Sequence, residues 1–399
     1  MSLREKIIQE IRASGPISFS QYMEMCLYDA EYGYYSRTVE QFGKAGDFYT
    51  SSDVHAVFGR LLARQFEEMW RVLGSPEKIE ILELGPGRGL FARDVLDWSE
   101  KKFPEFFGAV HYSLWERSEA LRARLRTTLE RHFAADKVSF AQRLKPLSSE
   151  KLYGTAEAVP SGVHIQDATT LSITPVIVFA NELFDALPVE VLGPEGELRI
   201  AEKGGCFVET WVAASSENLE FVDRYGVHPE NRERVETARV AEKLMSQLAA
   251  GIQRGFLVAV DYGYTRAEQL AGRHRGTVTA YRRHSVSGDP YEAPGEQDIT
   301  AHVNFTALAA AAEQQGMQVQ TLLTQSQFLM GIGEANQFGD AFEECRLPQE
   351  HAKVALQLKH LVTPAGMGES FHVLVASKAV AAEQVDRLSG LAFGTRNKK

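Results

Sequence analysis

The segment 78–94, KIEILELGPGRGLFARD, constrains the fold more than any other part of the chain. Its first seven residues are the short, largely apolar run of a buried strand, and its last residues begin a helical pattern. The glycines between them permit a tight turn in which the backbone lies close to a ligand. A strand, a glycine-rich turn and a helix in this order are typical of the first unit of a doubly wound sheet that binds a nucleotide-like cofactor.

The spacing of the glycines limits which cofactor this turn can hold. A dinucleotide turn follows G-x-G-x-x-G, and Gly85 and Gly87 fit it, but Leu90 takes the third position and the extra glycine is Gly89. The Gly-Lys-Ser/Thr of a triphosphate loop is missing from the turn. The remaining pattern, E-x-G-x-G-x-G, starts at Glu83 near the end of the predicted strand. A carboxylate there suits a cationic amino-acid moiety, which favours S-adenosylmethionine.

Polar side chains also follow the next predicted strands. Glu116 ends the run AVHYSLWE, where an acidic residue commonly takes ribose hydroxyls, although dinucleotide sites share this device. Asp167 follows a third short strand, GVHIQDA, and is placed to accept from an adenine amino group. An alternative for Glu83 is that it caps the following helix. The cofactor-binding residues predicted from these segments are Glu83, Gly85, Pro86, Gly87, Gly89, Glu116, Asp167, Ala168 and Asn181.

Strands and helices alternate along most of the chain, which predicts an α/β fold with a mostly parallel sheet. Helices are expected at 3–13, after Ser18, and at 54–73, 89–102 and 118–132; strands are expected at 78–84, 109–116, 162–168, 175–183, 255–263, 318–325 and 370–378, with an antiparallel strand possible among the last two. We expect an N-terminal helical cap with a lid loop (1–75), a cofactor domain (76–380) and a C-terminal tail (381–399). The cofactor domain carries insertions at about 188–214, predicted as hairpins, and at about 264–304, predicted as irregular.

Composition excludes several classes of protein. The net charge of −10 and the lack of a dense basic block argue against a nucleic-acid-binding protein. Three widely spaced cysteines and the lack of an HExxH pattern predict no disulfide framework and no metal site. The N-terminus resembles neither a signal nor a transit peptide, and no apolar run is long enough for a membrane span. A cytoplasmic protein is therefore expected, and a homodimer is left open.

Several segments resemble a known family. ELGPGRG resembles motif I of the class I S-adenosylmethionine-dependent methyltransferases. Seven further segments resemble, in order and spacing, the MidA family, whose mitochondrial members are protein arginine methyltransferases needed for assembly of respiratory complex I. They are YGYYS (32–36), GDFYTSSDVHAVFGRLLA (46–63), NELFDALPVE (181–190), DYGY (261–264), GTVTAYRRH (276–284), DITAHVNF (298–305) and MGESFHVL (367–374). The chain departs from the family pattern at Asp53, where the family has proline, and at Asn304, where it has aspartate.

The resemblance implies a Rossmann-like class I methyltransferase sheet with an N-terminal helical cap and a β-rich or irregular insertion on the substrate side. It implies S-adenosyl-L-methionine as cofactor, S-adenosyl-L-homocysteine as product, and an arginine side chain of a partner protein as acceptor. It also implies that a loop with Gly46, Asp47 and Phe48 folds over the cofactor. Two alternatives stay open: methylation of a small molecule at oxygen or nitrogen, and a non-catalytic assembly protein that keeps the pocket.

Methylation of a guanidinium requires carboxylates, because this group stays protonated and must be held with its charge localised. Glu182 and Asp185 in NELFDALPVE are the first candidates; three residues apart, they would point the same way on a first helical turn. The alternative is that Asp185 is structural and Glu182 is solvated. His302 is the next candidate, as a base oriented by Asp298, although a lone histidine in a loop is more often structural.

Overall fold

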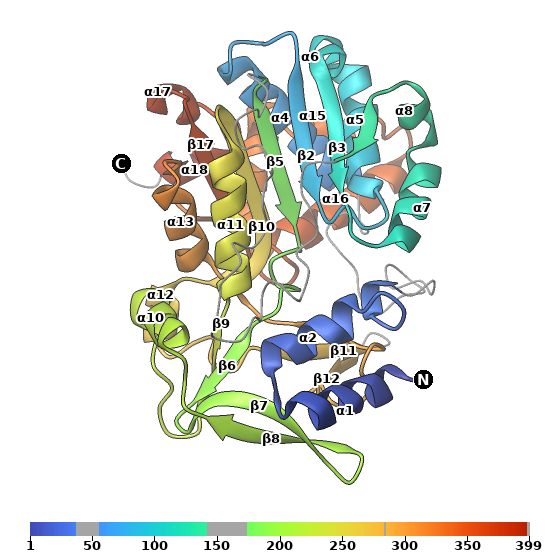
Figure 1. Cartoon of the computed structure of the whole chain (residues 1–399). Coiled ribbons are helices and arrows are strands. Elements are labelled where there is room, and N and C mark those ends of the chain that lie inside the picture. Colours follow the sequence, from blue (N-terminus) through green and yellow to red (C-terminus); the bar gives the residue numbers. More distant parts are fainter. Residues whose placement is uncertain (37–55, 142–173, 283–284, 397–399) are drawn as a thin grey trace.

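The computed structural model describes residues 1–36, 56–141, 174–282 and 285–396. Within this part the chain forms two lobes, one above the other in Figure 1. The upper lobe contains the larger sheet, in the order β15-β17-β10-β5-β2-β3-β4. Its strands are β2 (Ile79–Leu84), β3 (Val110–Trp115), β4 (Val138–Phe140), β5 (Val176–Asn181), β10 (Gly255–Tyr264), β15 (Gln318–Val319), β16 (Leu323–Thr324) and β17 (Phe371–Lys378), with β14 (Val303–Asn304) paired to the end of β10.

The direction of the strands follows the predicted alternation. β4, β3, β2, β5 and β10 run parallel to one another. β17 is antiparallel to β10, and β15 and β16 are antiparallel to β17, so the expected antiparallel strand is present. The chain leaves β2 toward β3 on one side and returns to β5 on the other. This reversal creates a crevice at the carboxyl ends of β2 and β5, the position at which doubly wound sheets bind ligands.

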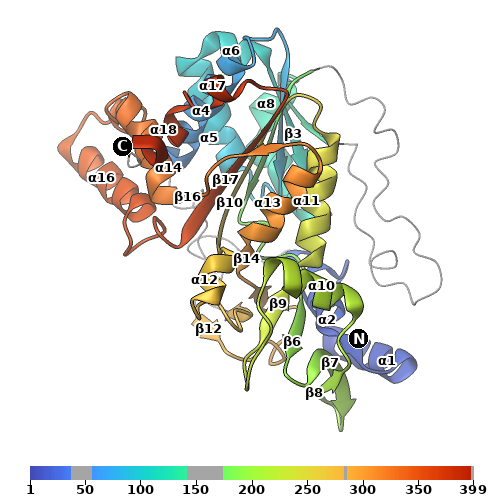
Figure 2. The ribbon, with the colours of Figure 1, turned by 90° about the vertical axis from the view of Figure 1, so that its left-hand side faces the viewer.

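Both faces of this sheet are buried because its strands are apolar at nearly every position. On β10, Leu257 and Ala259 pack in one core with α11 (Arg239–Gly251) and α13 (Phe305–Gln314). The alternate residues Phe256 and Val258 pack in a second core on the opposite face. Figure 2 shows the sheet edge-on. The helices on this second face include α4 (Ala56–Val72), α5 (Leu90–Lys102), α6 (Pro104–Ala109), α14 (Gln325–Ala335), α15 (Gly339–Phe342), α16 (Pro348–Val362), α17 (Ala382–Val385) and α18 (Ser389–Arg396).

The lower lobe brings the N-terminus together with both insertions at the carboxyl ends of the parallel strands (Figure 1). Its sheet has the order β1-β7-β6-β9 with β8 beside β7, and a small sheet has the order β12-β11-β13. The elements are α1 (Leu3–Ser14), β1 (Ile17–Ser18), α2 (Phe19–Tyr28), η1 (Tyr34–Ser36), β6 (Glu190–Gly193), β7 (Gly196–Lys203), β8 (Cys206–Val212), α10 (Ser216–Tyr225), β9 (Val235–Thr237), α12 (Arg266–Leu270), β11 (Thr279–Arg282), β12 (Ser285–Ser287) and β13 (Asp298–Thr300). The predicted hairpins at 188–214 are therefore present.

Several predicted elements differ in detail. Ser18 caps α2 as expected, its hydroxyl accepting from the backbone of Gln21 at 3.0 Å. The helix expected at 118–132 is interrupted at Leu129 and forms α7 (Glu119–Thr128) and α8 (Glu130–Ala134). The strand expected at 318–325 is the two short strands β15 and β16, because only their residues reach β17. The insertion at 264–304, expected to be irregular, contains α12 and the small sheet. The strand expected at 162–168 lies outside the described residues.

The two ends of the chain pack against different parts of the fold. α4 packs against α5 on the parallel sheet, whereas residues 1–36 pack against the insertions. Beyond residue 381, α18 contacts α14 and α4. Among the described helices, none combines the length and apolarity that crossing a bilayer requires.

Candidate cofactor and acceptor site

The glycine-rich turn joins β2 to α5 and has the backbone conformation that requires glycine. Gly85, Gly87 and Gly89 have φ of +63°, +52° and +76°. A Cβ at Gly85 would lie 2.9 Å from Cδ1 of Leu183, so the turn passes directly beside the segment that follows β5. A Cβ at Gly89 would lie 2.7 Å from a methyl group of Leu125 on α7, which explains the extra glycine by packing. The turn is thus fixed by its neighbours on both sides.

Glu83 lies one residue before the end of β2 and is only 4% exposed. Its Oε2 accepts a hydrogen bond from the hydroxyl of Tyr112 at 2.9 Å. Burial raises the pKa of Glu83 from 4.5 to about 8, because removal from water disfavours the charged form. The residue at the N-cap of α5 is Gly89, without a side-chain cap, so the alternative role of Glu83 as a helix cap is not observed. A buried carboxylate at this position is suited to a cationic ligand group.

Glu116 follows β3 and is half-buried at the same edge of the sheet. Its Oε1 accepts from the backbone N–H of Ser118 at 2.7 Å. Burial raises the pKa of Glu116 to about 7, and the backbone amides of Ser118 and Arg117 partly oppose that rise. β2 and β3 are parallel neighbours, so Glu83 and Glu116 end up beside the glycine turn from separate strands.

A cavity of about 960 Å³ extends from the glycine turn toward the lower lobe. Of the predicted cofactor-binding residues, Glu83, Gly85, Pro86, Gly87, Glu116 and Asn181 line it, and Gly89 lies immediately before its lining residue Leu90. Gly46, Asp47, Phe48, Asp167 and Ala168 lie outside the described residues. The same cavity is lined by Glu182 and Asp185, and by tyrosines of the N-terminal segment and of the second insertion. One continuous space therefore connects the predicted cofactor residues with the predicted acceptor residues.

The segment after β5 is a turn and not the helical turn that we expected. Glu182 has φ of +50°, a left-handed conformation that reverses the chain at the strand end. Asp261, at 0% exposure, accepts at its Oδ2 from the backbone N–H groups of Leu183, Phe184 and Asp185 at 3.2, 2.9 and 3.3 Å. The three backbone N–H groups converge on the Asp261 carboxylate because the turn wraps around it. Asp261, which the sequence placed at a strand end, therefore fixes the conformation of the turn.

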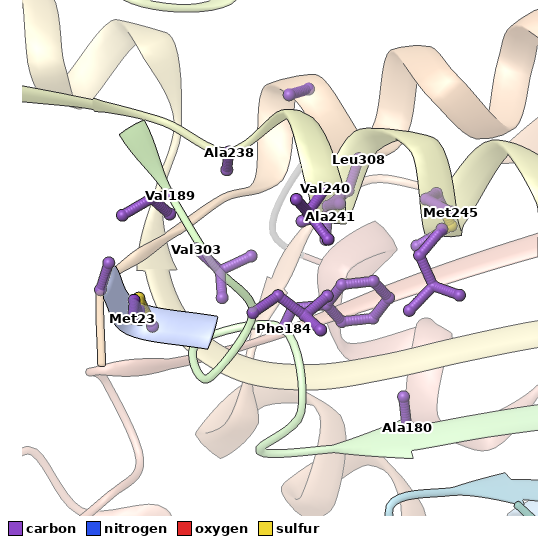
Figure 3. Close-up of a cluster of buried hydrophobic side chains, with 14 of the residues drawn as sticks. Met23, Ala180, Phe184, Val189, Ala238, Val240, Ala241, Met245, Val303 and Leu308 are labelled. Carbon is purple, nitrogen blue, oxygen red and sulfur yellow. The ribbon is translucent and has the colours of Figure 1, made fainter. Parts of the chain in front are cut away.

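Phe184 anchors this turn in the core between the lobes. Figure 3 shows its ring among side chains of α2, α11 and α13, including Met23, Met245 and Leu308. Burial of such a ring contributes about 1.5–3 kcal/mol. Because Phe184 points into the core, its neighbours Leu183 and Asp185 line the cavity.

The lower lobe holds the other end of the turn. The hydroxyl of Tyr28 donates to the carbonyl of Ala186 at 3.0 Å, and the backbone N–H of Ala301 donates to the carbonyl of Asp185 at 2.9 Å. Asp185 and Asn181 line the cavity, and among the described residues their Oδ1 atoms are buried without a well-placed hydrogen-bond donor. Buried polar atoms are nearly always paired, so these two oxygens indicate positions for ligand donors.

The carboxylates around the turn repel one another. Burial raises the pKa of Asp185 from 3.8 to about 6. Burial, then the negative charges of Asp185 and Glu182, raise the pKa of Asp261 well above its usual range. A positively charged group in the cavity would relieve this repulsion, so the turn is suited to bind a cation.

His302 lines the cavity but has a different partner from the one that we expected. Its Nδ1 lies 3.0 Å from Nδ1 of His274, and its ring contacts Tyr262 edge-on at 5.3 Å. Asp298, the expected partner, accepts from the hydroxyl of Tyr35 at 2.9 Å instead. Burial, together with the neighbouring His274, lowers the pKa of His302 to about 4, so it is neutral at pH 7 and a weak base.

Sequence reasoning missed several residues of this site. Tyr28 and His274 carry no motif, and only their contacts reveal them. The tyrosines of YGYYS gave a weak signal, since the segment is too aromatic for an idle linker. In residues 1–36, 56–141, 174–282 and 285–396, no group of three or more histidine, cysteine or acidic side chains is arranged to hold a metal ion.

Comparison with known proteins places this geometry in context. Residues 61–323 match the family model described as "Putative S-adenosyl-L-methionine-dependent methyltransferase". The mitochondrial protein arginine methyltransferase NDUFAF7 homolog of Drosophila melanogaster is 28% identical, covering 98% of this chain and 88% of its own length. Human mitochondrial protein arginine methyltransferase NDUFAF7 is 26% identical, and the match covers 92% of this chain and 81% of the human protein. A COG1565 superfamily crystal structure from Burkholderia thailandensis, bound to S-adenosyl-homocysteine, aligns with a TM-score of 0.78 and 26% identity over 96% of this chain and 94% of that chain.

These comparisons also correct one prediction. The relatives from Drosophila and human are named as mitochondrial proteins, which contradicts the cytoplasmic location expected from the N-terminus.

Proposed function

Because the chain belongs to the MidA family of S-adenosyl-L-methionine-dependent methyltransferases, we propose that it methylates an arginine side chain of a partner protein. The observation that carries the proposal is the cavity that is lined both by the glycine turn and by the buried carboxylate residue Asp185. A cationic acceptor at that carboxylate would lie in the same space as the cofactor. The names of the Drosophila and human relatives as protein arginine methyltransferases support the choice of acceptor.

The residues on the cofactor side of the cavity fit S-adenosyl-L-methionine. Gly85 lines the cavity with a left-handed backbone, which allows the backbone itself to lie against a ligand. We assign Glu83 to the cationic amino-acid end, Glu116 to the ribose hydroxyls, and Oδ1 of Asn181 to a donor of the cofactor. When bound, this cofactor supplies a methyl group on a sulfonium, which makes the group reactive toward nitrogen.

The task of the chain is to hold the acceptor and to take its proton. Glu182 and Asp185 are assigned to bind the guanidinium, because carboxylates pair with its N–H groups and localise its charge. The attacking nitrogen gains the methyl group and loses one proton, so the methylated guanidinium keeps its single positive charge. Asp185 is assigned as the proton acceptor, since a pKa near 6 makes it a better base than an ordinary carboxylate. His302, with its pKa near 4, is assigned to the wall of the cavity.

The test uses a protein extract from source cells in which the gene has been deleted. The purified protein is added with S-adenosyl-L-methionine that carries a heavy methyl group, and labelled residues are identified by mass spectrometry. We expect label on arginine side chains, reduced at least tenfold by Asp185→Asn or Glu182→Gln. The matched control is Glu292→Gln, an exposed carboxylate of the second insertion, which should leave labelling unchanged.

Two results would overturn the proposal. Label found only in the small-molecule fraction would identify a metabolite methyltransferase. Cofactor binding without label in any fraction would favour an assembly protein that keeps the pocket.

A further inference from the structure

A further carboxylate, Asp298, lines the cavity from the insertion side. Asp298 begins β13, is only 3% exposed, and accepts from the hydroxyl of Tyr35 at 2.9 Å. Its partner on the neighbouring antiparallel strand β11 is Tyr281. Directly opposed residues of an antiparallel pair project from the same face, about 4.5–5.5 Å apart at Cβ. Asp298, Tyr35 and Tyr281 all line the cavity, so the small sheet and the N-terminal segment form one wall together.

This wall lies close to the turn that carries Asp185. Burial, then the charges of Asp185 and Asp298, raise the pKa of Tyr281, so both carboxylates are electrostatic neighbours of its ring. Burial and then the same two carboxylates, among other groups, also raise the pKa of Tyr35. The ring of Tyr35 lies 5.5 Å from that of Tyr28, whose hydroxyl holds the turn at Ala186. Asp185 and Asp298 therefore line the same space from separate elements, together with the rings of Tyr35 and Tyr281.

The chemistry of this space selects a particular kind of ligand. Among the described residues, Oδ1 of Asp185 is buried without a well-placed hydrogen-bond donor, and the hydroxyl of Tyr262 lies beside the carboxylate, so a donor from a ligand in the cavity would complete its hydrogen bonding. A positively charged donor is favoured, because Asp185 and Asp298 are both buried and a cation offsets the cost of ionising them. A guanidinium presents N–H groups along more than one edge and stacks on aromatic rings, whereas an ammonium is a compact point charge. Carboxylates on two sides and flat rings as walls match the planar group.

We propose that Asp298 joins Glu182 and Asp185 in holding the guanidinium of the acceptor, in a subsite walled by Tyr35 and Tyr281. The inference rests on the proposed function for the acceptor's identity and extends it by naming residues that select arginine over lysine. Asp298 takes part as a binding residue rather than as the orienting partner of a histidine. The subsite is assembled from the N-terminal segment, the turn after β5 and the second insertion, so it exists only when the two lobes pack together.

The test measures binding of a small guanidinium probe, without any partner protein. Full-length protein saturated with S-adenosyl-L-homocysteine is titrated calorimetrically with N-acetyl-arginine amide and, separately, with N-acetyl-lysine amide. Asp298→Asn keeps an oxygen that can accept from Tyr35 but removes the charge. We expect it to weaken the arginine probe about 10- to 100-fold, as loss of a charged hydrogen-bond partner does, with unchanged affinity for S-adenosyl-L-homocysteine. The control Glu292→Gln removes an exposed charge from the same insertion and should change neither affinity.

Tyr281→Leu is a second variant, which tests the aromatic wall if Asp298→Asn does not fold. It should weaken the arginine probe several-fold and affect the lysine probe less. Unchanged binding of the arginine probe to Asp298→Asn or to Tyr281→Leu would overturn the inference. So would equal affinity of the native protein for the arginine and lysine probes.

Failure of this inference can be told apart from failure of the proposed function. If arginines of the extract are labelled but Asp298→Asn binds the probe normally, the subsite is wrong and the function stands. If the probe depends on Asp298 but label appears only in small molecules, the subsite is supported, and the partner-protein acceptor is wrong.

Discussion

Glu83 should make cofactor binding depend on pH, if it meets the ammonium of S-adenosyl-L-methionine. Its pKa is raised by burial from 4.5 to about 8 in the structure without ligand. At pH 7 about 0.9 of the molecules then carry a proton on Glu83 before binding. The ionised carboxylate is the form that attracts an ammonium, so binding must displace that proton. Affinity should consequently rise about tenfold from pH 6 to pH 7 and about fivefold from pH 7 to pH 8. It should fall again above pH 8, where the α-amino group of the ligand loses its own proton.

The assay is calorimetric titration with S-adenosyl-L-methionine in two buffers of different ionisation enthalpy, which counts the protons released. Glu116, whose pKa is about 7, releases part of a proton as well, so the comparison with a variant is decisive. Glu83→Gln keeps an acceptor for the hydroxyl of Tyr112 and should lower the release at pH 6.5 by about one proton. Equal proton release by Glu83→Gln and the native protein, or a flat affinity from pH 6 to pH 8, would refute the assignment.

The same pKa predicts a stability change that needs no ligand. The folded pKa of Glu83 lies above its unfolded value, so its favourable contribution is complete below pH 4.5 and is lost as the pH rises through about 8. The rise from 4.5 to about 8 corresponds to about 5 kcal/mol of unfolding free energy. Glu83→Gln should therefore be more stable than the native protein at pH 8, measured by denaturant unfolding without ligand. A less stable variant at that pH would show that the carboxylate is not held in an unfavourable environment.

Three further substitutions test the turns that line the cavity. Gly85→Val should abolish binding of S-adenosyl-L-homocysteine in calorimetry, because a Cβ at this position would lie 2.9 Å from the side chain of Leu183. The control Gly74→Val should bind normally, because Gly74 is also left-handed but a Cβ there would have no other atom within 4 Å. Binding by both variants would contradict close backbone approach. Asp185→Asn should raise the free energy of unfolding at pH 8 by about 1–3 kcal/mol, since the raised pKa means that its charge costs stability above pH 6. It should also lower methyl transfer at least tenfold, and full activity would remove Asp185 from the acceptor site. Asp261→Asn should lower the free energy of unfolding by about 1–3 kcal/mol, because its amide would face backbone N–H donors. The rate of methyl transfer by Asp261→Asn should also fall, while its affinity for the cofactor stays within twofold of the native value. A loss of cofactor affinity alone would show that Asp261 does not act through the turn.

The cofactor side of the site could be predicted because its determinants are local or follow from regular geometry. The strand, turn and helix around Gly85 are set by hydrophobic period and glycine position within one short segment. Parallel strands end at the same edge of a sheet, so Glu83, Glu116 and Asn181 were expected together once the strands were recognised. The family resemblance added the cofactor and the class of reaction, which the comparisons confirm.

The acceptor side was decided by tertiary packing. Tyr35 and Asp298 are 263 residues apart and meet through a hydrogen bond that no periodicity predicts. The sequence offered Asp298 as the orienting partner of His302, but in the structure Nδ1 of His302 lies beside Nδ1 of His274. The turn after β5 folds around Asp261 instead of starting a helix, because a buried carboxylate on another strand accepts its N–H groups. Local pattern fixes how a segment folds and which edge of the sheet it reaches; the chain as a whole decides which distant side chains meet there, because only the packing of both lobes places them.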